Sequence, residues 1–234
     1  MRPKPSIEQP GRVSRFRVKV CGIRTVADAA AALDAGVEAI GLNFYSKSRR
    51  CVSPDDAKRI ADAVGGELLL VGLFVNESVE RIRQVQSAVG LDVIQLHGDE
   101  PAKLWRGRED VTLIRGLRWP PADEIEEAFV KDWTEAADDL SVVAYLVDAN
   151  VRGLFGGTGA TTDWRSLRPR PAAFLGSRLI LAGGLTPMNV AAAVKASRCD
   201  AVDTAGGVEA TDGSKDPKLM ADFAAAALAA FAQS

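Results

Sequence analysis

The chain has 234 residues, 47% of them hydrophobic, and a formal net charge of −2 at pH 7. This length supports one substantial core, so a single barrel or two small domains are the realistic architectures. The balanced charge offers no basic surface for nucleic acid, and no run reaches the roughly 18 consecutive apolar residues of a membrane span. We therefore expect a soluble protein with neither nucleic acid nor membrane as a partner.

Residues 1–16 are rich in Pro, Arg and Ser and lack apolar periodicity, which predicts a disordered N-terminal leader. This segment also lacks the apolar central region of a signal peptide. The three cysteines, Cys21, Cys51 and Cys199, cannot all pair within one chain, so reduced thiols in a cytoplasmic compartment are expected. Their spacing matches no zinc motif and His97 is the single histidine, so no metal site is expected.

From residue 17 onward, short apolar runs alternate with helical patterns. Strands are predicted to begin near residues 17, 39, 68, 93, 112, 142, 179 and 201. Helices are predicted near 25–35, 54–64, 77–89, 100–106, 121–137, 163–168, 187–197 and 217–231. Strands that alternate with helices pair in parallel, and eight such units predict an α/β protein with a (β/α)8 TIM barrel as its single domain over residues 17–234.

The alternative architecture is an open, doubly wound sheet. It is disfavoured because Cys21-Gly22-Ile23-Arg24 stands where a glycine-rich dinucleotide fingerprint would follow the first strand. Explicit helix caps support the alternating pattern, since a side-chain acceptor stands before each of several predicted helices. These caps are Ser53, Thr186 and Asp216, each followed by proline, and Asn76 without proline.

In a barrel of this kind the carboxyl ends of the strands and the loops after them build the active site. The residues at these ends are, in chain order, Cys21, Asn43 and Phe44, Phe74 to Asn76, Gln95 to Gly98, Arg115, Asp148, Gly183-Gly184 and Gly206-Gly207. The loop after the second strand adds a cationic cluster, Lys47 to Arg50, suited to an anionic group. Arg115 is expected to line the pocket or to pair with an acid.

Three glycine turns suit phosphate binding because glycine lets backbone N–H groups approach an anion closely. They are Gly156-Gly157-Thr158-Gly159, Gly183-Gly184 and Gly206-Gly207. Strand-to-helix connections also use glycine for geometry alone. Three such turns in one sector of the barrel nevertheless favour a phosphorylated small molecule as the ligand.

Cys21 and Asp148 end strands that are far apart in sequence and nearly opposite in the expected barrel. A thiolate can abstract a proton and a carboxylic acid can donate one, so the pair suits an isomerase that needs neither cofactor nor metal. Each residue has a structural alternative, as a small core residue for Cys21 and as a turn cap for Asp148. For His97, a structural hydrogen bond below the site and a contact with substrate are equally compatible with the sequence.

Several motifs together resemble the phosphoribosylanthranilate isomerase family of tryptophan biosynthesis. The similarity spans roughly residues 17–231 and rests on the number, order and spacing of motifs that are weak alone. They are Lys19 to Ile23, Gly41 to Phe44 with Ser48 to Arg50, Gly72 to Asn76, Gln95 to Glu100, Gly156 to Gly159 with Asp163-Trp164, Leu181 to Leu185 with Asn189-Val190, and Gly207 to Glu209 with Gly213, Lys215 and Asp216.

The resemblance implies a cofactor-free Amadori rearrangement of N-(5-phosphoribosyl)anthranilate. It implies that Asp148 is the general acid that opens the furanose ring and that Cys21 is the general base that removes the C2 proton. Arg50 is implied to bind the anthranilate carboxylate. The phosphate is implied to lie on backbone amides around Gly157, Gly159, Gly183, Gly184, Ala205, Gly206 and Gly207, and His97 is a further candidate for substrate binding.

The chain departs from the family pattern at three places. Ala205-Gly206 stands where the family usually has two serines, which removes two hydroxyl donors to phosphate and puts affinity in doubt. Thr162 and Cys51 stand where aromatic residues are common, so substrate packing is expected to differ.

Other readings of the sequence stay open. One is a related barrel isomerase with another phosphorylated substrate, such as a histidine-pathway aminoimidazole isomerase, although Cys21 and Arg115 stand where two aspartates would be expected. A second is a catalytically silent protein that binds a phosphorylated ligand, and a flavin-binding barrel is a weaker third. The oligomeric state is open between monomer and homodimer.

Overall fold

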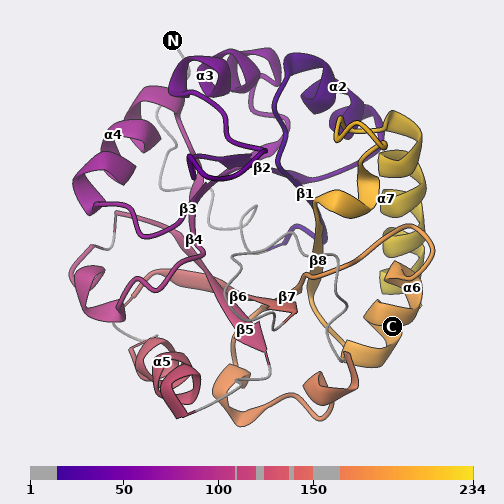
Figure 1. The fold of residues 1–234 in the computed structure, drawn as a ribbon. Coiled ribbons are helices and arrows are strands. Elements are labelled where there is room, and N and C mark those ends of the chain that lie inside the picture. Colours follow the sequence, from indigo (N-terminus) through magenta and orange to yellow (C-terminus); the bar gives the residue numbers. More distant parts are fainter. Residues whose placement is uncertain (1–14, 109, 120–123, 137–139, 150–163, 234) are drawn as a thin grey trace.

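The computed structural model of the chain describes residues 15–108, 110–119, 124–136, 140–149 and 164–233. Eight parallel strands close into a barrel in the order β1 to β8, so each strand pairs with its neighbours in sequence and β8 pairs with β1 (Figure 1). Their bounds are Val18–Cys21, Ala39–Asn43, Leu69–Phe74, Val93–Leu96, Leu113–Trp119, Val142–Ala149, Leu179–Leu181 and Ala201–Thr204. The predicted barrel is confirmed, and the open sheet is wrong.

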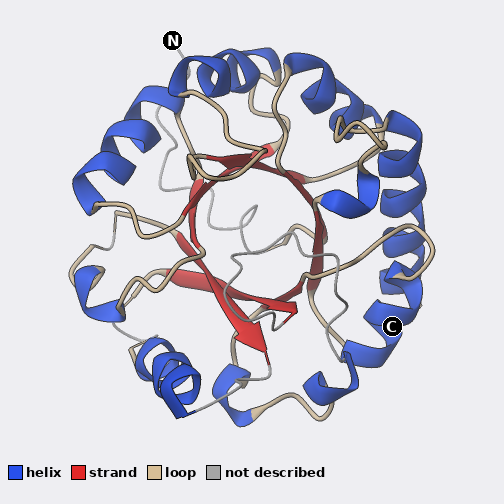
Figure 2. Ribbon diagram, in the orientation of Figure 1, coloured by secondary structure: helices blue, strands red, loops and turns tan. Residues whose placement is uncertain are grey.

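The helices lie outside the ring of strands (Figure 2). They are α2 (Val26–Asp34), α3 (Pro54–Ala63), α4 (Val79–Val89), α5 (Glu124–Glu135), α6 (Val190–Ser197) and α7 (Pro217–Ala232). Short 3₁₀ helices stand at η1 (Ala102–Leu104), η3 (Trp164–Leu167), η4 (Ala172–Phe174) and η5 (Gly206–Val208). The helices predicted near 100–106 and 163–168 are therefore single 3₁₀ turns, because those segments are too short for a stable amphipathic α-helix.

Two of the predicted caps are present and two are not. The Ser53 side chain accepts from the Asp56 amide, and the Asp216 side chain accepts from two amides at the start of α7. The Thr186 prediction is wrong, because three turn residues follow Thr186 and α6 begins only after Asn189.

Ser78, not Asn76, caps α4, since its side chain accepts from the Arg81 amide. Asn76 instead adopts a left-handed backbone with φ of 53°. Its side chain accepts from the Asp99 amide, so it joins the loops after β3 and β4.

The strands are buried on both faces, as expected where side chains alternate between the barrel interior and the surrounding helices. The interior cluster contains Ala39, Leu69, Val71, Ile114 and Leu146 with other small and branched residues. Because Lys19 is in register with Ala39 and Asp203 lies two residues after Ala201, both charged side chains also belong to the interior set.

Phe16 is 3% exposed and packs in this interior cluster at the end where the strands begin. The predicted disorder is therefore wrong at Phe16. Residues 1–14 of the predicted leader lie outside the described residues, and disorder there stays a prediction. Among the described residues, no helix is long and apolar enough to cross a membrane.

Candidate active site

A cleft of about 340 Å³ lies at the carboxyl ends of β6, β7 and β8. Its volume is within the usual range for small-molecule sites. It is lined by Arg49, Arg50, Asp148, Ala182, Gly183, Gly184, Leu185, Thr186, Asp203, Thr204, Ala205, Gly206 and Gly207. Seven of the residues predicted from the sequence, from four separate segments, therefore meet in one cleft.

The turn after β7 needs its glycines, since Gly183 and Gly184 have φ of 86° and 63°. Asn189 braces this turn, because its Nδ2 donates to the Gly184 carbonyl at 3.0 Å and its Oδ1 accepts from the Thr186 amide at 2.8 Å. The turn is thereby held rigid ahead of α6. This explains why Asn189 stands at the start of α6 without capping it through its side chain.

The turn after β8 packs directly against the turn after β7. A Cβ atom at Gly207 would collide with the Leu185 carbonyl, so only glycine fits there. Among the hydrogen bonds within the described part of the chain, none uses the N–H groups of Gly184, Gly206 or Gly207. Three free donors at adjacent turns can bind an anion such as a phosphate.

Cys21 ends β1 and is 6% exposed. It packs with Leu73 and Val75, and Ala205 from the cleft wall packs against this cluster. Burial raises the pKa of the Cys21 thiol, while Lys19 and Lys215 act in the opposite direction. The thiol is therefore at the edge of the cleft in a mostly apolar pocket with cations close by.

Asp148, near the end of β6, lines the cleft and lies beside His97. The His97 Nε2 is 3.6 Å from the Asp148 Oδ2, and the His97 Nδ1 is 3.2 Å from the Gln95 Nε2. A Cβ atom at Gly116 would collide with the His97 ring, so the glycine on β5 makes room for it. The two predictions for His97, a structural hydrogen bond below the site and a contact with substrate, both stay predictions; its position next to Asp148 was not predicted from the sequence.

Asp148 and Cys21 are separated by β7 and β8 around the barrel wall. The sequence placed them nearly opposite. Both strand ends border the same opening, because Asp203 of the intervening strand β8 and Ala205 directly after it line the cleft.

Arg50 lines the cleft and is paired with Glu209. Its Nε donates to Glu209 Oε1 at 2.5 Å and its Nη2 donates to Oε2 at 2.9 Å, so Glu209 occupies one edge of the guanidinium. The other edge, Nη1 with the second proton of Nη2, makes no hydrogen bond among the described residues. A planar guanidinium can bind a carboxylate through either edge.

Glu209 lies at the centre of a cluster of cationic side chains. It also accepts from Arg49 at 2.6 Å and from Lys215 at 3.1 Å, so three cations surround one carboxylate and the cluster is positively charged. Burial would raise the pKa of Glu209, but its hydrogen bond with Arg50 and the charge of Lys215 lower it below the usual value. Lys215 also donates to the Ala205 carbonyl at 2.8 Å, which fixes the turn after β8.

Arg115 does not belong to the site. It alternates with the interior residue Ile114 and points toward α5, where its guanidinium lies over the rings of Phe129 and Trp133. It forms a buried ion pair with Glu100 at 2.6 Å and donates to the Gly98 carbonyl. Of the two roles expected for Arg115, the pairing with an acid is confirmed and the pocket-lining role is wrong.

Gly157 and Gly159 lie outside the described residues, so their predicted contact with phosphate stays a prediction. The sequence reading assigned no role to Lys19, Asp203 or Glu209. A signal existed for the first two, since each interrupts a short apolar strand at an interior position. Glu209 was noted only as part of a motif, because its three cationic partners come from segments far apart in sequence.

The closed barrel and the location of the cleft define the protein as a member of the (β/α)8-barrel enzymes, whose sites form at this end of the strands. Comparisons with known proteins give the family. Residues 18–226 match the family model described as N-(5'phosphoribosyl)anthranilate (PRA) isomerase. The chain belongs to this family.

Relatives with the same name cover nearly the whole chain. The N-(5'-phosphoribosyl)anthranilate isomerase of Pseudomonas paraeruginosa is 46% identical over 207 residues, which is 88% of this chain and 92% of the relative. That of Neisseria meningitidis is 41% identical over 214 residues, which is 91% of this chain and 97% of the relative.

Solved structures agree. The phosphoribosyl anthranilate isomerase of Thermotoga maritima superposes with a TM-score of 0.78 at 35% identity, covering 92% of this chain and 99% of that one. A phosphoribosyl anthranilate isomerase in complex with reduced 1-(o-carboxyphenylamino)-1-deoxyribulose 5-phosphate superposes with a TM-score of 0.75 at 34% identity, with the same coverage.

Proposed function

We propose that the protein converts N-(5-phosphoribosyl)anthranilate into 1-(2-carboxyphenylamino)-1-deoxyribulose 5-phosphate, the third step of the tryptophan branch. The observation that carries this proposal is that Asp148 and the glycine turns after β7 and β8 line one cleft, with Cys21 at its edge. The proposed reaction is an isomerisation that requires only proton transfers, for which a carboxylic acid and a thiolate are sufficient.

Asp148 is the proposed general acid. It protonates the furanose ring oxygen, the bond between this oxygen and C1 breaks, and the nitrogen lone pair forms a C1–N iminium ion. The neighbouring His97, whose Nε2 lies 3.6 Å from Oδ2, is the residue proposed to orient the carboxyl group. A general acid that is held in the reactive orientation lowers the barrier more than one that rotates freely.

Cys21 is the proposed general base. Its thiolate removes the proton from C2, the C–H electrons form the C1–C2 double bond, and the iminium π electrons return to nitrogen to give an enolamine. The enolamine then tautomerises to the ketone. Acid and base groups of this kind typically contribute about 10²- to 10⁴-fold each to the rate.

The two anionic ends of the substrate have separate proposed sites. The phosphate lies on the free N–H groups of Gly184, Gly206 and Gly207, with Ala205 and Gly183 completing the turns. The anthranilate carboxylate binds the edge of Arg50 that Glu209 leaves open. The excess positive charge around Glu209 favours both anions.

We further propose a cytoplasmic location, supported by three cysteines that are all free in the structure. The protein acts as a monomer or a homodimer. A crystal structure described as monomers of the dimeric Thermotoga maritima enzyme supports keeping both states in the proposal.

The test is a fluorescence assay with freshly generated phosphoribosylanthranilate on the native protein, Cys21→Ser and Asp148→Asn. Native turnover is expected, with kcat lowered at least about 10²-fold in both variants and substrate binding nearly unchanged, because both groups act mainly in the transition state. A variant that keeps near-native kcat would show that its residue does not have the assigned role.

Ala205-Gly206 gives a specific reason to test a silent binding protein as well, since it lacks the hydroxyl donors that the family usually has at this turn. Calorimetric titration with the product separates the two functions. Binding of the product without turnover of the substrate by the native protein would favour the silent binding protein, whereas turnover would reject it.

A further inference from the structure

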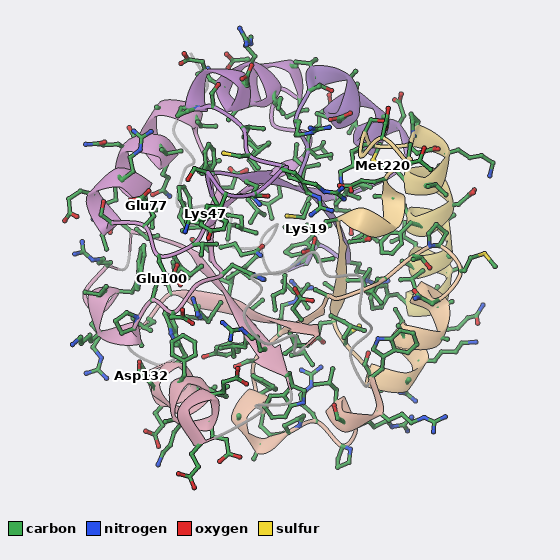
Figure 3. All side chains as sticks on the ribbon, in the orientation of Figure 1. Lys19, Lys47, Glu77, Glu100, Asp132 and Met220 are labelled. Atoms are coloured by element: carbon green, nitrogen blue, oxygen red, sulfur yellow. The ribbon has the colours of Figure 1, made fainter. Side chains whose placement is uncertain are left out.

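A buried ion pair lies beneath the reactive end of the cleft and has no part in the mechanism above. The Lys19 Nζ is 2.9 Å from the Asp203 Oδ1, and their side chains are 0% and 9% exposed. The two residues stand at the same level on the paired strands β1 and β8. Figure 3 labels Lys19 within the ring of strands.

A lysine at this position is costly, since a buried ammonium loses its hydration and needs compensation. An apolar side chain would fill the barrel interior at lower cost, as Val71, Ile114 and Leu146 do. The location of Lys19 two residues before Cys21 puts both side chains on the interior face of β1. The ammonium donates to Asp203 at 2.9 Å, and its charge also acts on the thiol two residues further along the same face of the strand.

We propose that Lys19, held in place by Asp203, is a positioning residue that supplies the positive charge on which the action of Cys21 as a base depends. This inference rests on the proposed function of Cys21. It concerns how a thiol in an apolar pocket is brought to its reactive, ionised form.

Most of the charged groups around the thiol are cations, and the exception is the carboxylate of Asp203, which raises the pKa of the thiol. Lys19 faces it from β1, Asp203 from β8, Lys215 from the segment before α7 and Arg50 from the loop after β2. Burial raises the pKa of the thiol, and Lys19 is the strongest of the groups that oppose the rise. Tyr45 packs against the apolar cluster of Cys21, Leu73 and Val75 but is uncharged in its ordinary form.

Asp203 has the complementary task of keeping Lys19 charged. Burial alone would lower the pKa of Lys19, but attraction to Asp203 and to Cys21 outweighs it and leaves the pKa above its usual value. Asp203 is itself faced by Asp148 from β6 and by His97 from the end of β4. The pair therefore links the proposed base on β1 to the neighbourhood of the proposed acid on β6.

The experiment uses Lys19→Met and the double variant Lys19→Met with Asp203→Asn, which leaves no buried unpaired charge if the single variant does not fold. Lys58→Met is the control, because Lys58 is an exposed lysine paired with Asp62. The ionisation of Cys21 is followed by thiolate ultraviolet absorbance as a function of pH. Subtracting the same variant with Cys21→Ser removes the signals of Cys51, Cys199 and the tyrosines.

Lys19→Met is expected to shift the Cys21 midpoint upward by roughly one pH unit or more, the size expected when an adjacent opposite charge is lost. The double variant is expected to shift the midpoint in the same direction by a smaller amount, because Asp203→Asn also removes a negative charge that raises the pKa of the thiol. The midpoint is expected to stay unchanged in Lys58→Met. The rising limb of kcat/KM against pH shifts with the midpoint, because less thiolate is present at any given pH.

A folded double variant that titrates at the native midpoint would overturn the proposal. So would a loss of turnover with no shift in the absorbance titration or the pH profile, since that result fits a purely structural lysine. The titration needs no substrate, whereas native turnover of phosphoribosylanthranilate tests the proposed function, so the two hypotheses fail on different measurements.

Discussion

At the scale of single residues, the charged side chains that line the site are held in place by ion pairs with other charged side chains. Arg50 reaches its position through two hydrogen bonds to Glu209, and Glu209 in turn is held by Lys215. The resemblance to the family implied Arg50 as a substrate-binding residue, and the cationic loop around it predicted binding of an anionic group in general. Its partner was not predicted, because Glu209 lies 159 positions after Arg50 and only the folded barrel brings them together.

We predict that Glu209→Gln raises KM about tenfold or more and leaves kcat within about threefold of native. Loss of the carboxylate removes a charge-assisted hydrogen bond, which typically contributes about 1.5–3 kcal/mol, and leaves three cations that repel each other. Steady-state kinetics with phosphoribosylanthranilate measures the effect. Glu135→Gln, at an exposed carboxylate paired with Lys131, is the control, and an unchanged KM in Glu209→Gln would show that Arg50 needs no support from Glu209.

At the scale of the elements, Glu100 and Arg115 join the loops after β3 and β4 to β5 and α5. The Glu100 carboxylate accepts from the amides of Asn76 and Gly98 and from Arg115. Figure 3 labels Glu100 near the wall of the barrel. The network holds the loop that carries His97 without entering the cleft, so it is a structural support for the site.

We predict that Arg115→Met lowers the free energy of unfolding by about 3–5 kcal/mol, because it leaves the Glu100 carboxylate buried and unpaired. Urea denaturation followed by circular dichroism measures this change. Arg83→Met provides the comparison, since Arg83 and Asp110 form an exposed pair that contributes less than about 1 kcal/mol. Equal effects of the two substitutions would contradict the assignment of a buried network.

The elements themselves were largely predictable. All eight strands begin within one residue of the predicted positions, because parallel strands buried on both faces are short apolar runs bounded by turn residues. The helix starts at Thr186 and Asn76 were wrong for a shared reason. An Asn or Thr just after a strand end resembles a helix cap in the sequence. In the structure, the residues after both strand ends form loops before the helix begins, and the side chains of Asn76 and Asn189 hold these loops by hydrogen bonds.

At the scale of the whole molecule, the barrel divides into an end for stability and an end for chemistry. Phe16 packs where the strands begin, and the cleft lies where they end. The class of fold and the general location of the site followed from the alternating pattern. The pairing of Lys19 with Asp203 did not, because it depends on the register with which β8 closes onto β1.

We predict that Phe16→Ala lowers the free energy of unfolding by about 3–5 kcal/mol, the usual cost of removing a buried aromatic ring, while kcat stays close to native. Chemical denaturation and the fluorescence assay test the two parts separately. Leu175→Ala is the control, because Leu175 is 68% exposed and its loss creates no cavity. A stable Phe16→Ala protein would indicate that the start of the barrel needs no apolar plug.

The contact between Gly207 and the Leu185 carbonyl has a consequence for how this sequence can evolve. No mutation at Gly207 is accessible without moving the backbone of both turns, so this position is fixed by geometry. Gly206 is different, because an added Cβ atom would meet side-chain atoms and no backbone, namely Arg50 Nη2 at 3.3 Å and the Glu209 carboxylate at 4.0 Å, so a small shift of Arg50 would accommodate it. A lineage can therefore exchange side chains at position 206 and change how tightly it holds an anion, while the neighbouring glycine preserves the shape of the turn through every such exchange.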